Sequence, residues 1–224
     1  MSRQSHEHDH HHDQTFQPDI PEPSADWEFT EIALRELLIE KGVVTARELA
    51  DTVEAWEGKS PEGGAKIVAR AWVDPEFKAR LLQDGNAAVA ELGFVVEGTK
   101  LIVLENTPDV HHMVVCTLCS CYPRPILGIP PLWYKSREYR SRAVREPRAV
   151  LAEFGTEVPD DREVRVVDST ADCRYLVMPQ CPPGTEGQGE AELAALITRD
   201  SMIGTAQALL PDGHRVGAAA APVA

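Results

Sequence analysis

The chain has 224 residues and a formal net charge of −14, from 36 acidic and 22 basic residues. This balance argues against binding to nucleic acid or to an anionic membrane surface, because both need clustered Lys and Arg. The hydrophobic content of 43% excludes global disorder, no apolar run approaches the ~20 residues that cross a bilayer, and the N-terminus lacks a secretory pattern. We therefore expect a cytoplasmic protein that handles a small molecule or another polypeptide.

The first expected segment is a histidine-rich head at residues 1–25. It holds five histidines, namely His6, His8, His10, His11 and His12. Asp9 interrupts the run, unlike in a purification tag. Clustered neutral imidazoles bind late first-row divalent ions, so one interpretation is a metal-delivery segment. The other is a flexible, solvated polar tail, and the residues leave both open.

Residues 26–95 show the signals of short helices joined by helix-breaking residues. Apolar residues at three- and four-residue spacings predict a helix from Asp26 that stops near Gly42. Thr45 and Glu48 are then typical of a capping box. Further helices are expected at 61–72, 75–82 and 84–92, with Asp74 as the cap of the middle one. We interpret the segment as a helical arm that packs on a partner chain.

Residues 96–208 change to a mixed pattern of strands and helices. Strands are expected at 101–104, 113–115, 163–168 and 174–178, and helices at 136–154, split near Pro147, and at 190–197. A proline-rich turn is expected after the cysteine cluster, and residues 209–224 form a flexible tail. The chain has no internal repeat, and the pattern indicates an α+β protein.

Three of the five cysteines crowd into Cys116-Thr117-Leu118-Cys119-Ser120-Cys121. An odd number of cysteines with this spacing is a poor disulfide framework and a good metal or redox cluster. A structural zinc site normally takes four ligands from two separated pairs, and no second pair stands at a suitable distance. A thioredoxin-like pair would leave Cys121 without a role. The remaining alternative to a metal or redox site is a chance cluster of buried cysteines without a function.

Ser120, between two cysteines, suggests a fourth possibility. A tight turn there would aim the backbone nitrogens of Ser120 and Cys121 at the same centre as the three sulfurs. Five strong donors that leave one position open suit a Lewis-acid catalyst. Only a trivalent, strongly polarising ion would deprotonate peptide nitrogens, and the residues alone do not say which ion.

The stretch VVCTLCSCYP at residues 114–123 resembles the metal-binding motif of nitrile hydratase alpha subunits. Similar stretches follow it and precede it: LGIPP at 127–131, WYKS at 133–136, YRSR at 139–142, VREPR at 144–148, RYLV at 174–177, PGTEG at 183–187, TRD at 198–200, ARAW at 69–72, DP at 74–75 and ENTP at 105–108. The resemblance covers roughly residues 26–204.

The resemblance implies a particular metal centre. Cys116 would be the axial thiolate, Cys119 would be oxidised to a sulfinic acid and Cys121 to a sulfenic acid. The amide nitrogens of Ser120 and Cys121 would complete the ligand set. Family members with Thr at position 117 tend to hold cobalt(III), and those with Ser tend to hold iron(III), so Thr117 favours cobalt.

The resemblance also implies a fold, an activity and a partner. The fold would be a helical N-terminal arm followed by a four-layered α-β-β-α domain. The activity would be that of a lyase that hydrates a nitrile to an amide, with Cys119, Ser120 and Cys121 at the catalytic centre and the Cys121 sulfenate oxygen as nucleophile or base. The partner would be a beta-type subunit, in one chain or divided into two as in the three-subunit toyocamycin nitrile hydratase, that supplies two arginines to the oxidised sulfurs.

Two residues depart from the family pattern. Arg124 stands where most members have Trp, and Glu97 stands where many have Gln. Arg124 and the histidine-rich head are features of the thiocyanate hydrolase gamma subunit, so conversion of thiocyanate to carbonyl sulfide and ammonia is the alternative activity. Arg124 itself is either a solvated or subunit-facing residue or one that contacts substrate. A metal-storage protein or metallochaperone is a third possibility, and it would hold an exchangeable metal and unoxidised cysteines.

Overall fold

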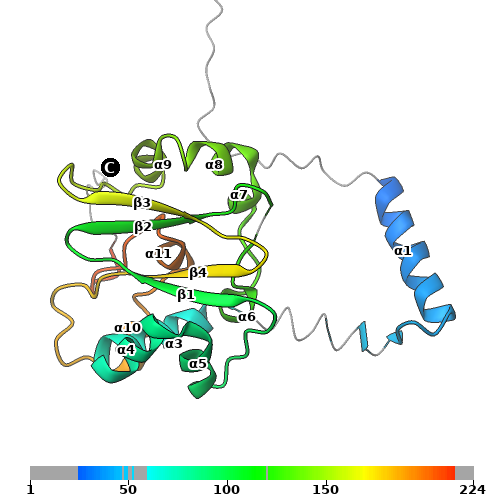
Figure 1. The fold of residues 1–224 in the computed structure, drawn as a ribbon, viewed down its shortest axis with the longest axis horizontal. Helices are drawn as coiled ribbons and strands as arrows, with labels where there is room; N and C mark the ends of the chain where they lie inside the picture. The colour runs from blue at the N-terminus through cyan, green and yellow to red at the C-terminus, as the bar shows by residue number, and fades with distance from the viewer. Residues whose placement is uncertain (1–24, 47, 50–51, 53–59, 120, 215–224) are drawn as a thin grey trace, which may run out of the picture.

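The computed structural model describes residues 25–46, 48–49, 52, 60–119 and 121–214. Residues 1–24 of the predicted head and 215–224 of the predicted tail lie outside this part of the chain. The elements, drawn in Figure 1, are α1 (Ala25–Glu40), α3 (Glu62–Val73), α4 (Pro75–Gln83), α5 (Gly85–Glu91), β1 (Lys100–Glu105), β2 (Val110–Val115), α6 (Arg124–Leu127), α7 (Leu132–Lys135), α8 (Arg137–Arg142), α9 (Pro147–Glu153), β3 (Glu163–Asp168), β4 (Cys173–Met178), α10 (Glu190–Ala194) and α11 (Arg199–Ile203). Within the described residues, no helix is long and apolar enough to span a membrane.

Two pairs of parallel strands form the centre of the fold. β1 pairs with β4, and β2 pairs with β3. Figure 1 shows α8 and α9 on the outer side of β3, and α3, α4 and α5 on the outer side of β1. β2 contacts β4, and α11 packs against both of these strands. This succession of helices, strand pair, strand pair and helices confirms the mixed helix-and-strand fold that the sequence predicted.

The helices that precede β1 begin and end at the signals seen in the sequence. Asp74 caps α4, because its carboxylate accepts hydrogen bonds from the backbone N–H groups of Glu76 and Phe77, each at 3.0 Å. Asp84 caps α5 by accepting from the Ala87 N–H at 3.1 Å. Such caps are local, so the sequence locates these helices to within one or two residues.

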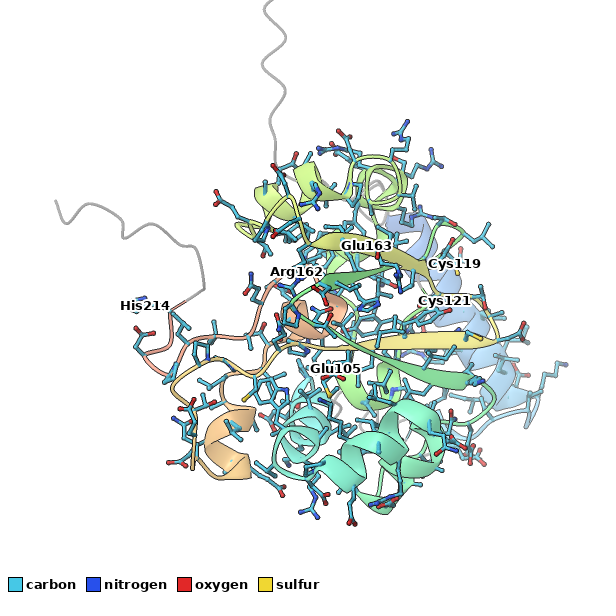
Figure 2. All side chains as sticks on the ribbon, turned by 60° about the vertical axis from the view of Figure 1, so that its left-hand side comes forward. Glu105, Cys119, Cys121, Arg162, Glu163 and His214 are labelled. Atoms are coloured by element: carbon cyan, nitrogen blue, oxygen red, sulfur yellow. The ribbon has the colours of Figure 1, made fainter. Side chains whose placement is uncertain are left out.

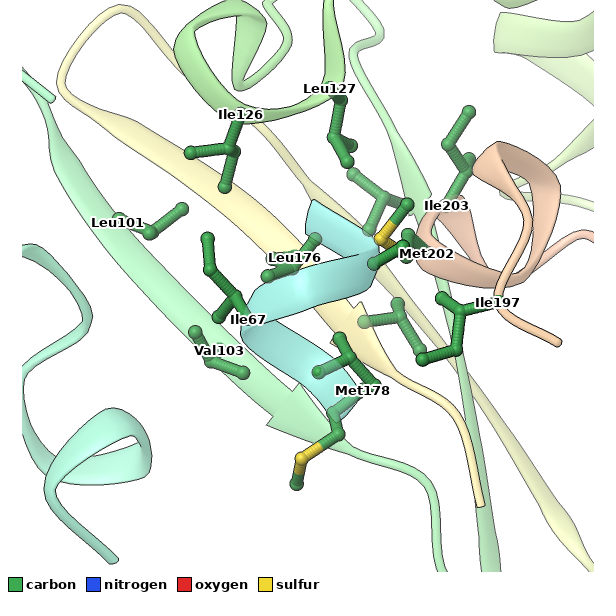
Figure 3. Close-up of a cluster of buried hydrophobic side chains, with 14 of the residues drawn as sticks. Ile67, Leu101, Val103, Ile126, Leu127, Leu176, Met178, Ile197, Met202 and Ile203 are labelled. Atoms are coloured by element: carbon green, nitrogen blue, oxygen red, sulfur yellow. The ribbon is translucent and has the colours of Figure 1, made fainter. Parts of the chain in front are cut away.

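The core lies between α3, the two strand pairs and α11. Figure 3 shows Ile67 of α3 among side chains of β1 and β4, and the sulfur of Met202 beside them. Gly64 permits this packing, because a Cβ there would lie 2.4 Å from Leu127 Cδ2 and 2.6 Å from the Met202 sulfur. A glycine in the first turn of α3 therefore lets that helix approach α6 and α11 closely.

Three parts of the fold differ from the sequence expectation. The expected proline-rich turn contains two short helices, α6 and α7: Pro125 lies in the first turn of α6 and Pro131 is the N-cap of α7, and proline costs no helical hydrogen bond at either position. α11 follows α10 as a separate helix, with Thr198 as its cap. β2 begins three residues before the expected start, so His111 and His112 are strand residues and are buried.

The predicted division into an arm at 26–95 and a catalytic domain at 96–208 stays a prediction. In the structure α4 and α5 pack on β1, and α3 packs on α6, α10 and α11. A boundary at residue 95 would therefore separate elements that share one core, and the helices of 62–91 belong structurally with the strands.

Candidate metal centre

The ends of β2 and β3 place the cysteine-bearing loop. Cys116 directly follows β2 and is fully buried. Val115 lies opposite Asp168 in the parallel register, so the last residue of β3 stands beside the start of the loop. The Thr117 N–H donates to Asp168 Oδ1 at 2.9 Å, and the Thr117 hydroxyl donates to Asp168 Oδ2. One carboxylate thus fixes both the backbone and the side chain of Thr117.

The loop brings three sulfurs to one point. Sγ of Cys119 lies 3.5 Å from Sγ of Cys116 and 3.3 Å from Sγ of Cys121. All three sulfurs are within 4.8 Å of one another, and the Cys119 N–H donates to Cys116 Sγ at 3.3 Å. Bonds of about 2.3 Å from one ion to two thiolates at a right angle place the sulfurs about 3.3 Å apart. The sulfur positions therefore fit a common metal ion without rearrangement of the loop.

Two buried tyrosines donate hydrogen bonds to backbone carbonyl groups in and next to the cysteine-bearing loop. The Tyr134 hydroxyl donates to the carbonyl oxygen of Cys121 at 2.9 Å, and the Tyr139 hydroxyl donates to that of Val114 at 2.6 Å. Burial raises the pKa of both phenols above their ordinary value, so both remain neutral donors. Edge contacts from Trp133 to both tyrosine rings hold these side chains in place.

The surroundings of the Cys121 thiol raise its pKa and favour its protonated form. Burial, the hydrogen bond with Cys119 and the nearby Cys116 raise the pKa of the Cys121 thiol to about 12. A cation is needed to make such a cluster a set of thiolates, and binding would release the protons.

The structure describes only part of the predicted set of metal ligands. The structure brings together the sulfurs of Cys116, Cys119 and Cys121. Ser120 lies outside the described residues, so its amide nitrogen as a ligand stays a prediction. Among the described residues Cys173 and Cys181 do not join the cluster.

A cavity of about 370 Å³ opens beside the cluster. Cys119 and Cys121 line it together with Glu97, Arg124 and Arg174. The remaining wall is largely apolar and includes Val96, Tyr122, Pro125, Gly128 and Ile129. Glu97 and Arg124, the two residues that depart from the family pattern, therefore both line the cavity beside the sulfurs.

Sequence reasoning missed two residues that shape the site. Asp168 comes from β3, about fifty positions after the cysteines, and its only signal was an acid at the end of an alternating strand. Tyr134 lies within the stretch WYKS, where the resemblance was noted without a role for the hydroxyl. Neither contact follows from residue spacing.

The hydrogen bonds of Asp168 should control the mobility of the loop start. In an Asp168→Asn variant, loss of a charge-assisted acceptor should raise amide exchange at Thr117 about tenfold, the effect of roughly 1.4 kcal/mol. Hydrogen exchange read by mass spectrometry or NMR measures this. Asp172→Asn, at an exposed position in the following turn, is the matched control. Equal protection of Thr117 in both variants would contradict the assigned role.

Comparisons with known proteins agree with this geometry. The family model for the nitrile hydratase alpha chain matches residues 25–206. The alpha subunit of the cobalt-containing nitrile hydratase of Pseudonocardia thermophila is 53% identical over 175 residues, which are 77% of this chain and 86% of the relative. The gamma subunit of thiocyanate hydrolase from Thiobacillus thioparus is 45% identical over 197 residues, 83% of this chain and 81% of the relative.

Solved structures give the same result. A double mutant of the Fe-type nitrile hydratase from Comamonas testosteroni Ni1 superimposes with a TM-score of 0.81 at 44% identity, covering 90% of this chain and 98% of that one. The matched region contains the cysteine loop, both strand pairs and the helices around them. The chain therefore belongs to the nitrile hydratase alpha-chain family, a family of enzyme subunits.

Proposed function

We propose that this chain is the metal-carrying catalytic alpha subunit of a nitrile hydratase that converts a nitrile to its amide. The observation that carries the proposal is the spacing of 3.3 and 3.5 Å between the sulfurs of the cluster, beside a cavity of about 370 Å³. We propose a low-spin cobalt(III) ion as the metal, because Thr117 lies within the motif and the Pseudonocardia relative is named as cobalt-containing.

Cys116, Cys119 and Cys121 would hold the ion through sulfur, and Ser120 and Cys121 through their amide nitrogens. The ion would supply Lewis acidity that polarises the nitrile or a water molecule. Cys121, as a sulfenate, would offer the oxygen that attacks the nitrile carbon or accepts a proton from water. Cys119, as a sulfinate, would keep the charge of the cluster fixed. Asp168 and Tyr134 would hold the loop so that these atoms keep their positions during turnover.

A beta-type partner subunit, in one chain or two, is part of the proposal. Leu118, at the tip of the loop, is 84% exposed, and the neighbouring Cys119 is exposed as well. An apolar side chain beside a polar cluster is poorly placed in water, and a covering chain would bury it. The partner would also supply the arginines that hydrogen-bond to the oxidised sulfurs. We further propose the cytoplasm as the location, where cysteine clusters stay reduced until metal is loaded.

The metal content provides the first test. The chain purified with its partner should contain about one cobalt per chain, held far more tightly than any ion at the histidine-rich head. Elemental analysis after chelator treatment measures this, and a variant that lacks residues 1–13 is the control. Loss of cobalt together with the head, or iron at the cluster in cobalt-supplemented cells, would contradict the proposal.

One observation favours a second candidate function. The guanidinium-bearing Arg124 lines the cavity beside the sulfurs, and a cation there suits an anionic substrate such as thiocyanate. Assays of both substrates on the assembled protein separate the candidates. Nitrile hydratase activity should give the amide and leave thiocyanate unchanged, whereas preferential release of carbonyl sulfide and ammonia would assign the chain to the thiocyanate hydrolase branch.

A further inference from the structure

Arg162 is a buried cation at the opposite end of the strands from the cysteine cluster. It immediately precedes β3, and only 8% of its surface is exposed. Figure 2 shows Arg162 near the middle of the view and Cys119 and Cys121 to its right. The parallel register explains this separation, because β2 and β3 begin beside Arg162 and end beside the metal centre.

No carboxylate compensates this guanidinium within the described residues. Arg162 Nη2 donates to the amide oxygen of Gln180 at 2.8 Å and to the carbonyl oxygen of Val110 at 3.4 Å. Arg162 Nε is buried and has no hydrogen-bond partner. Two acids are next to it in sequence: Glu163 binds Arg165 instead, and Asp161 forms no ion pair with Arg162. An isolated buried charge with an unsatisfied N–H is costly, so the position calls for an anion.

A second cation, Arg148, lies close to Arg162 and adds positive charge there. Arg148 donates to the carbonyl oxygens of Val158, Pro159 and Arg162, and the structure gives it no ion pair with any described acid. Two arginines thus lie together, and neither forms an ion pair with a described carboxylate, in a chain whose net charge is −14. Burial lowers the pKa of Arg162, the direction expected where no anion offsets the desolvation of its charge.

A cavity of about 220 Å³ adjoins Arg162. Its wall includes Asn106, His111, Gln180 and Cys181. Gln180 turns its amide oxygen to Arg162, and its amide nitrogen, which has no partner among the described residues, remains a donor at the exposed edge. His111 Nε2 donates to the Gly204 carbonyl oxygen at 2.8 Å, so the ring is held by the protein and supplies no negative charge.

We propose that this cavity is a binding site for a small carboxylate. The Arg162 guanidinium, which lines the cavity, would donate to one oxygen, and the Gln180 amide nitrogen would donate to the other or to the same oxygen. Planar carboxylates suit the guanidinium, and charge-assisted hydrogen bonds in a buried site are strong. The carboxylate belongs either to a free small molecule or to an acidic side chain of a partner subunit. The site is separate from the metal centre and does not depend on the nitrile-hydrating activity.

Acetate titration of the full chain tests the proposal directly. In ¹⁵N NMR spectra the Arg162 Nε–H and Gln180 side-chain amide signals should shift saturably with acetate, and much less with sodium chloride at the same ionic strength. Arg162→Met should weaken acetate binding, measured by calorimetry, at least about tenfold. Arg162→Lys keeps the charge without the planar fork and should bind with intermediate affinity. Gln180→Leu, at an exposed position, provides a milder variant if Arg162→Met does not fold.

Arg165→Met is the matched control, because it removes an exposed arginine three positions further on whose partner is Glu163. It should bind acetate like the unmodified chain. The same titration on the complex with its partner separates the two sources: saturable binding there supports a free carboxylate, and binding seen only with the isolated chain supports an acidic side chain of the partner. Absence of saturable binding in both, or equal binding by Arg162→Met, Gln180→Leu and the control, overturns the proposal.

Discussion

A Cys121→Ala variant is expected to lose nitrile hydration almost completely, with a decrease in kcat of about a thousandfold or more. The substitution removes a sulfur that lies 3.3 Å from that of Cys119, and with it the proposed nucleophilic oxygen. Cys116 and Cys119 would still offer two sulfurs 3.5 Å apart, so part of the metal should remain bound. Activity should therefore fall much further than metal content.

Steady-state assays of amide formation and elemental analysis of the same preparation measure the two quantities. Cys173→Ala and Cys181→Ala are the matched controls, since both thiols lie outside the cluster. They should keep both metal and turnover. A Cys173→Ala variant without metal would show that the ligand set is drawn wrongly, and an active Cys121→Ala variant would exclude the proposed nucleophile.

The parts of the fold that depend on local signals could be predicted from the sequence. The capping box of Thr45 and Glu48 is present, with the Thr45 N–H donating to Glu48 Oε2 at 2.8 Å and the Glu48 N–H donating back at 3.1 Å. The bounds of α4 followed equally from Asp74 and Pro75. These contacts join residues three positions apart, so residue types alone specify them.

The pairing of the strands could not be predicted in the same way. β1 and β4 pair although more than sixty residues separate them, and parallel pairing needs long crossover connections with no fixed sequence signature. The start of β2 was missed for a different reason. His111 and His112 look polar in the sequence, but their hydrogen bonds allow their burial: His111 Nε2 donates to the Gly204 carbonyl oxygen, and the His112 backbone N–H donates to Asn106 Oδ1.

The residues around the metal centre could likewise be predicted from the sequence only in part. Spacing and family resemblance identified the three cysteines, because they lie on one loop. The Asp168 carboxylate and the Arg124 side chain reach the site through the register of β3 and the position of α6. Such neighbours depend on tertiary packing, and only the folded chain shows which side chains converge on the sulfurs.

His111 should make the protein less stable in acid. Burial lowers the pKa of this imidazole from 6.5 to about 4, although the hydrogen bond to the Gly204 carbonyl partly opposes the shift. Below pH ~6.5 His111 binds a proton in the unfolded chain but stays neutral in the folded chain. The free energy of unfolding therefore falls as the pH falls towards about 4. The lowering of the pKa from 6.5 to about 4 corresponds to roughly 3 kcal/mol, and above pH ~6.5 the residue contributes no pH dependence.

A His111→Gln variant should remove this part of the pH dependence, because the amide of Gln can still donate to the Gly204 carbonyl without titrating. Urea unfolding at several pH values between 7 and 4 measures the effect. The unmodified chain should lose roughly 3 kcal/mol more than the variant over this range, while the carboxylates, common to both, cancel in the comparison. His214→Gln, at an exposed position, is the control and should follow the unmodified chain. Parallel stability curves for His111→Gln and the unmodified chain would show that His111 has the same pKa in the folded and unfolded chains, and would place the acid sensitivity in other groups.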